Sequence, residues 1–234
     1  MSKEKGEGWW LCILVLLYHG VNQLSHSPTS AILNPMDIQQ WLGTGSINIF
    51  GRPFAGKDTQ GKRLAELFDG ILLGGGDILR NSTIPEHISA QLHKGELIPS
   101  EDYVSIVLPY LSKPEFADKP LILSSVGRWI GEEQGVIVAA EQSNHPLKAV
   151  IYLELSEDEV RRRWNALEHH DDRGGRHDDT AEILEKRLRE FREKTLPVLD
   201  VYKNLGLLIT INGNQSREDV GQDILVQLQS LAQK

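Results

Sequence analysis

The chain has 234 residues, of which 40% are hydrophobic and 25% are charged, and its formal net charge is −8. Such a chain is typical of a soluble globular protein with one large domain, or with one domain that carries small inserts. The acidic balance argues against a general binder of nucleic acids or membrane surfaces. The single cysteine, Cys12, excludes an internal disulfide framework and a zinc site built from thiolates.

Residues 1–45 are treated as an amino-terminal extension and linker of open status. The apolar run at 9–18 is too short for a transmembrane helix, and no clear small-residue cleavage site follows it. Three interpretations of residues 1–35 remain: a membrane-associating tail, a packed extra helix, or upstream sequence translated from a wrongly assigned start. The last is favoured, and a better-patterned sequence opens at Met36.

After this extension, short apolar runs alternate with longer amphipathic ones. Strands are expected at 47–50, 71–73, 120–123, 149–153 and 207–211, and helices at 57–68, 85–93, 101–111, 181–202 and 217–231. This alternation predicts an α/β fold with a doubly wound parallel sheet. The polar segment 169–179 is expected to be an exposed, mobile loop between two helices. Its three histidines, His169, His170 and His177, fit a polar loop better than a metal site.

The first strand and helix enclose a glycine-bounded loop, Gly51-Arg-Pro-Phe-Ala-Gly-Lys-Asp-Thr-Gln60. Strand, G-x-x-x-x-G-K loop and helix form the context of a phosphate-binding loop. Gly51 and Gly56 let the backbone curl, so that its N–H groups and the helix N-terminus point at phosphate oxygens. Lys57 supplies positive charge for the outer phosphates. The usual next residue is Ser or Thr, but here Asp58 follows and Thr59 comes one place later.

Several motifs follow the loop in a fixed order: GGGDILR, KGELIPSEDY, LILSSVGRW, RGGRHDD, EKRLREF, TLPVLDVY and INGNQSREDV. With the loop, this set resembles the adenylate kinase family of nucleoside monophosphate kinases over about residues 47–231. The resemblance implies a P-loop NTPase fold, a three-layer α/β/α domain with a parallel sheet over 46–234. It also implies a small NMP-binding insert at about 74–112 and a short lid at about 164–180, without the four cysteines of a zinc-bearing lid.

The implied reaction moves the γ-phosphoryl group of MgATP to a nucleoside monophosphate, with AMP as the first expectation. ATP and Mg²⁺ are therefore the expected substrate and metal, and small-molecule nucleotides the expected partners. No nucleic acid or membrane partner is expected. An ATP-using site argues for a cytoplasmic location, and the family suggests a monomer.

The resemblance assigns roles residue by residue. The catalytic set is Lys57, Arg128, Arg163, Arg176 and Arg187. The ATP-binding set is Gly51, Phe54, Ala55, Gly56, Lys57, Asp58, Thr59, Arg163 and Gln215, the last through its backbone. The acceptor-binding set is Gly75, Arg80, Glu96, Leu97, Ile98, Ser125, Val126, Gly127, Arg128, Glu132, Arg176 and Arg187. Arginine suits these positions because its planar guanidinium grips phosphate bidentately and stays charged.

Two departures from the family pattern concern magnesium. Asp58 replaces the third glycine of the loop, and Ser124 replaces an acidic residue at the end of the third core strand. We link the two changes: in one hypothesis Asp58 takes over as the carboxylate that holds Mg²⁺ or its waters. In the alternative, Asp58 caps the helix N-terminus.

Other departures leave the acceptor open. Gly75 stands where the family has threonine, Glu132 stands where it has an adenine-reading glutamine, and Leu167 replaces a lid arginine for which Arg173 is a possible substitute. An ionised Glu132 would accept a hydrogen bond from the exocyclic amine of adenine or cytosine. The alternatives are a CMP/UMP-type kinase, an inactive nucleotide-binding regulator, and a kinase tethered to a membrane by residues 9–18.

Overall fold

The computed structural model describes residues 34–86, 88–89, 100–168 and 180–234. These residues lie in one compact unit that starts at residue 33. Its helices are α2 (Pro35–Leu42), α3 (Lys57–Leu67), α4 (Gly75–Arg80), α6 (Ser100–Leu111), α7 (Glu132–Gln142), α8 (Glu157–Glu168), α9 (Ala181–Glu190), α10 (Leu196–Asn204) and α11 (Arg217–Ala232), with a 3₁₀ turn η1 at Pro114–Phe116 and a π-helical turn η2 at Phe191–Thr195. Its strands are β1 (Ser46–Gly51), β2 (Ile71–Gly74), β3 (Leu121–Ser124), β4 (Leu147–Glu154) and β5 (Leu208–Asn212).

The five strands form one parallel sheet in the order β2-β3-β1-β4-β5. The central strand β1 is buried along its whole length, as expected for a parallel strand covered on both faces. Its register pairs Ile49 with Ser124 of β3 and Phe50 with Tyr152 of β4. The expected α/β class and parallel sheet are confirmed.

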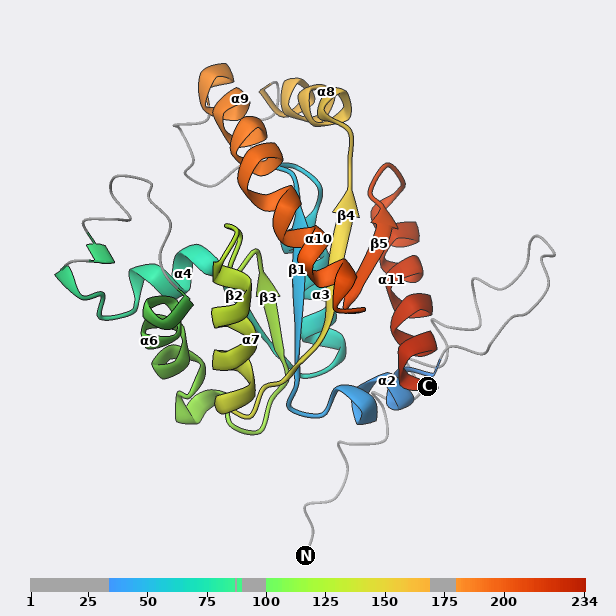
Figure 1. Cartoon of the computed structure of the whole chain (residues 1–234). Coiled ribbons are helices and arrows are strands. Elements are labelled where there is room, and N and C mark those ends of the chain that lie inside the picture. Colours follow the sequence, from blue (N-terminus) through green and yellow to red (C-terminus); the bar gives the residue numbers. More distant parts are fainter. Residues whose placement is uncertain (1–33, 87, 90–99, 169–179) are drawn as a thin grey trace, which may run out of the picture. The chain divides into compact units, whose positions relative to one another are not determined.

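Helices cover both faces of the sheet and make three layers (Figure 1). On one face, Ile47 and Ile49 pack in a core with side chains of α2, α3 and α11. On the other face, Leu121 and Leu123 pack against α6 and α7, while Phe50 packs against η2 and α10. The two faces receive alternate residues of β1 because successive side chains of a strand point to opposite sides.

Helix α2 belongs to this core, although it lies within residues 1–45, which were expected to form an extension. Ile38 and Leu42 are buried in the core shared with α3 and α11. The side chain of Gln229 on α11 accepts the N–H of Asn34 at 3.0 Å and donates to Asp37 at 3.1 Å. The compact unit therefore begins about a dozen residues earlier than expected; residues 1–33 lie outside the described part of the chain.

The long helix expected over 181–202 is interrupted by η2. The π-helical turn Phe191–Thr195 joins α9 to α10 without a break in the helical path. Such turns hold one extra residue and often occur at functional sites. The spacing of apolar residues predicted the helix. A single inserted residue shifts that spacing too little to be detected in the sequence.

Candidate active site

Several described polar residues singled out from the sequence lie on segments that leave one edge of the sheet. Because all five strands are parallel, their carboxyl ends share this edge, where open α/β sheets bind ligands. β1 leads into the phosphate-binding loop, β2 into α4, β3 into the segment 125–131, β4 into α8 and β5 into the turn at 213–215.

The phosphate-binding loop has the expected geometry. Gly51 ends β1 where a side chain would be crowded, since a Cβ there would lie 3.0 Å from the carbonyl oxygen of Leu153. Gly56 caps α3 with φ of 91°, a left-handed value that glycine adopts without strain. Phe54 also has a positive φ, 65°, which is uncommon for a bulky residue. Ala55 is buried in the core beneath the loop.

Lys57 is the first residue of α3 and folds back over the loop. Its Nζ donates to the carbonyl oxygens of Gly51 at 2.8 Å and Arg52 at 3.1 Å. The ammonium group is thus held at the helix N-terminus, where the helix dipole also favours anions. Thr59, two residues further along, is exposed.

Asp58 and Ser124, the two linked departures, meet in space. The Ser124 hydroxyl donates to Asp58 Oδ1 at 3.2 Å across 66 positions of sequence. The N-cap of α3 is Gly56, and no side chain caps this helix, so the capping alternative for Asp58 is wrong. Asp58 instead lies exposed in the first helical turn, between the phosphate-binding loop and the end of β3.

Gly75 and Arg80 lie on α4, which begins directly after β2. A Cβ at Gly75 would lie 2.7 Å from the carbonyl oxygen of Ser125, so the loop after β3 occupies the space that a threonine would need. Arg80 is exposed and pairs with Asp77 at 2.6 Å.

The segment after β3 carries Arg128 and is fixed at its start by two buried side chains. Asn48 of β1 donates to the carbonyl oxygen of Val126 at 2.8 Å and accepts its N–H at 3.3 Å. The hydroxyl of Tyr103 on α6 accepts the N–H of Gly127 at 2.9 Å. Arg128 itself is exposed at the sheet edge, so a rigid backbone presents a solvated guanidinium.

Sequence reasoning missed Asn48 and Tyr103 as supports of this segment. A signal for Asn48 was available, because a lone amide inside the buried run Ile47-Asn-Ile49 needs partners. Tyr103 gave no such signal, since tyrosine is common on the buried face of a helix.

Glu132 lies beneath the segment with 5% of its surface exposed. Its Oε2 accepts the N–H of Trp129 at 3.2 Å. Burial raises the pKa of Glu132 to about 7, although the N–H of Trp129 and the charge of Arg128 oppose the shift. A direct contact with an acceptor base therefore stays a prediction, and it requires this carboxylate to turn outward from its own loop.

Arg163 on α8 joins the phosphate-binding loop to the turn after β5. Its guanidinium donates to the carbonyl oxygens of Phe54 at 3.2 Å and Gly213 at 2.8 Å, and to Glu159 at 2.8 Å. In the same turn, the side chain of Gln215 donates to Asn212 O and to Asp223. Because the Gln215 side chain is hydrogen-bonded within the protein, only its backbone is expected to contact a ligand.

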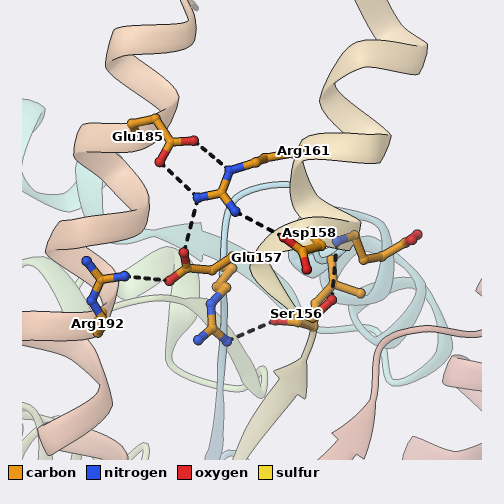
Figure 2. A network of polar contacts seen from close by, with 9 residues as sticks. Ser156, Glu157, Asp158, Arg161, Glu185 and Arg192 are labelled. Carbon is orange, nitrogen blue, oxygen red and sulfur yellow. Dashed lines mark hydrogen bonds and ion pairs between the residues drawn. The ribbon is translucent and has the colours of Figure 1, made fainter.

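Helices α8 and α9 flank residues 169–179 in sequence and are tied together by ion pairs (Figure 2). Arg161 bridges Glu157 and Asp158 of its own helix to Glu185 of α9, at 2.7–3.3 Å. Arg192 of η2 contacts Glu157 at 2.9 Å. Hydrogen bonding to Arg161 lowers the pKa of Glu185. Such exposed ion pairs weaken as the ionic strength rises, and they contribute little to the free energy of unfolding. Their main effect is to orient α8 relative to α9.

The remaining expected site residues divide into two groups. Arg187 is partly buried in the last turn of α9, and its role stays a prediction. Glu96, Leu97, Ile98 and Arg176 lie outside the described residues, as do the histidines of 169–179 and most of the lid, so their roles stay predictions. Within the described ranges, no helix is long and apolar enough to cross a membrane.

A parallel sheet with a glycine-bounded loop at the end of β1, and with Lys57, Arg128 and Arg163 at the same edge, defines a P-loop phosphotransferase. The adenylate kinase family model matches residues 49–207. Curated relatives are the adenylate kinases of Cyanothece sp. (33% identity, 75% of this chain and 91% of the relative) and Prochlorococcus marinus strain MIT 9211 (34%, 74% and 91%). The adenylate kinase of Methanosarcina barkeri is 28% identical, with 80% of this chain and all of the relative covered.

The chain belongs to the adenylate kinase family and is a kinase of this type. Among solved structures, a gluconokinase from Sinorhizobium meliloti superposes with a TM-score of 0.52 at 17% identity, covering 81% of this chain and 94% of that one. That likeness concerns the fold alone. The resemblance deduced from the ordered motifs is confirmed.

Proposed function

We propose that the chain transfers the γ-phosphoryl group of ATP to AMP, reversibly, and so forms two ADP. The observation that carries this proposal is the convergence of Lys57 and Arg128 at one sheet edge. In the proposal, Lys57 serves the donor and Arg128 the acceptor. Phosphoryl transfer needs alignment and charge neutralisation more than covalent help from the protein. The acceptor phosphate is already a nucleophile, so no strong base is required.

In this proposal the phosphate-binding loop and Lys57 hold the outer phosphates of ATP, with Arg163 fixing the loop against the Gly213 turn. Arg80 and Arg128 hold the acceptor phosphate, and Arg176 and Arg187 neutralise the moving group from the lid side. Gly75, Ser125, Val126 and Gly127 shape the acceptor pocket, with Glu96, Leu97 and Ile98 along the base. The protein would act as a cytoplasmic monomer in nucleotide homeostasis.

The test offers AMP, CMP, UMP, GMP and dTMP separately with ATP and Mg²⁺, and measures formation of the nucleoside diphosphate. We expect turnover with AMP, at least tenfold above any other acceptor. Preference for CMP or UMP would instead identify a pyrimidine nucleotide kinase. ATP binding with no turnover in any acceptor would contradict the proposal and indicate a nucleotide-binding regulator.

We further propose that Asp58 holds Mg²⁺ or its waters. Asp58 Oδ1 and Ser124 Oγ offer two oxygen ligands 3.2 Å apart beside the phosphate-binding loop. Mg²⁺ prefers oxygen ligands and is commonly held by one carboxylate with waters and substrate phosphates. When bound, the ion would neutralise phosphate charge.

The substitution Asp58→Ala is expected to raise the Mg²⁺ concentration for half-maximal activity by about tenfold, since one charged ligand is lost. Adding Ser124→Asp to this variant returns a carboxylate to the other side of the same contact and should restore much of the affinity. Mn²⁺ binding to the ATP-loaded proteins, followed by electron paramagnetic resonance, provides a readout besides activity. Unchanged metal dependence in Asp58→Ala would show that the metal role is wrong.

A further inference from the structure

The segment that carries Arg128 is held at its far end by two buried carboxylates. Glu132 accepts the N–H of Trp129 at 3.2 Å, and Glu133 accepts the N–H of Gly131 at 2.6 Å. Glu132 is 5% exposed and Glu133 is 8% exposed. Two carboxylates that begin a helix usually lie in solvent, where the helix dipole favours them. Here they are inside the protein.

Four titratable or charged groups from the surrounding elements interact electrostatically with Glu132. Glu133 comes from its own helix α7, Tyr103 from α6, Tyr202 from α10 and Arg128 from the loop. Among these neighbours only Arg128 is positively charged. Burial raises the pKa of both tyrosines, so they stay neutral, and the Tyr202 hydroxyl is buried with no hydrogen-bond partner among the described residues.

The charge of Arg128, which the proposed function assigns to the acceptor phosphate, therefore offsets part of the cost of burying the Glu132 carboxylate. We propose that Glu132 is a positioning residue for Arg128, and that it takes up a proton when an acceptor phosphate binds there. This inference rests on the proposed function. The carboxylate orients the loop through the Trp129 N–H, and its charge competes with the phosphate for Arg128.

The sign of the effect follows from linkage. An acceptor phosphate beside Arg128 adds negative charge near Glu132, which raises the pKa of Glu132 above its value of about 7 in the free protein. Protons that bind more tightly to the complex must also strengthen acceptor binding, because the coupling is reciprocal. Acceptor affinity should therefore fall as pH rises through 7 to 8, and a rise of one unit in this pKa corresponds to about tenfold.

The experiment measures the Kd and KM for AMP from pH 6 to 9 in the full chain and in Glu132→Gln. Glutamine keeps an oxygen for the Trp129 N–H but carries no charge. The titration of AMP itself is common to both proteins, so the ratio of their affinities isolates Glu132. We expect the wild type to lose about tenfold in affinity relative to Glu132→Gln between pH 6 and 9. Calorimetry in buffers of different ionisation enthalpy should show proton uptake near pH 7 in the wild type only.

Two further variants separate charge from shape. Glu141→Gln changes an exposed carboxylate on the same helix and should keep the wild-type pH profile. Glu132→Ala should weaken AMP binding at every pH, because the buried N–H of Trp129 loses its partner. Thermal unfolding is an activity-independent readout: a raised folded-state pKa makes the wild type lose stability as pH rises from about 4.5 to 7, and Glu132→Gln should not share that loss.

The outcomes distinguish the two proposals. If AMP binds and turns over but wild type and Glu132→Gln have parallel pH profiles, the proton link is wrong while the kinase proposal stands. If AMP does not bind but the unfolding transition retains its pH dependence, Glu132 is a buried carboxylate with a raised pKa, and the proposed acceptor site at Arg128 is wrong.

Discussion

Replacing Lys57 with alanine is expected to lower kcat for ADP formation by about a thousandfold. The Lys57 ammonium is held by the carbonyl oxygens of Gly51 and Arg52 before substrate arrives. Its charge is thus already oriented for the outer phosphates, and no reorganisation is needed during transfer. A coupled ADP assay with saturating ATP and AMP measures the change.

The matched control is Lys62→Ala, which removes an exposed lysine from the same helix α3 and should leave kcat within twofold. Circular dichroism and thermal unfolding check that both variants fold. A Lys57→Ala protein that folds and keeps more than a tenth of the wild-type kcat would contradict the assignment of the phosphate-binding loop.

Arg128→Ala is expected to lower kcat/KM for the acceptor by about a thousandfold, while the KM for ATP changes little. Arg128 is exposed at the end of β3 on a backbone fixed by Asn48 and Tyr103. The backbone around Arg128 is therefore already ordered before a phosphate binds. The loss of kcat/KM in Arg128→Ala should then reflect the missing contact between the guanidinium and the phosphate.

Two companions define the contact. Arg128→Lys keeps the charge but not the planar fork, so its activity should fall between those of wild type and Arg128→Ala. Arg217→Ala removes an exposed arginine at the start of α11 and should behave like wild type. Equal loss of ATP and AMP affinity in Arg128→Ala would mean that this arginine does not belong to the acceptor side alone.

The sequence was most informative where chemistry demands a particular residue at a particular spacing. The G-x-x-x-x-G-K loop predicted both the site and the flanking strand and helix, and the linked departures at Asp58 and Ser124 proved to be neighbours. Parallel strands explain this success, because residues that end different strands must meet at one edge.

Long-range burial was the part that the sequence could not predict. Glu132 matches a position that reads a base in the family, and nothing in a run of two glutamates indicates that both side chains turn inward. Their placement depends on the packing of α6, α7 and α10. It also depends on the conformation of the loop 128–130, which is flanked by Gly127 and Gly131, both with positive φ. Neither is encoded in local periodicity.

The π-helical turn η2 makes this part of the chain sensitive to the deletion of a single residue. Lys194 of η2 lies 3.9 Å above the ring of Trp129, next to Arg128. Deleting one residue from η2 would restore a regular helix and rotate α9 by about 100° relative to α10. That rotation would break the ion pair of Glu185 on α9 with Arg161 on α8. A change in residue count there would therefore be as disruptive as a change of residue type in the phosphate-binding loop.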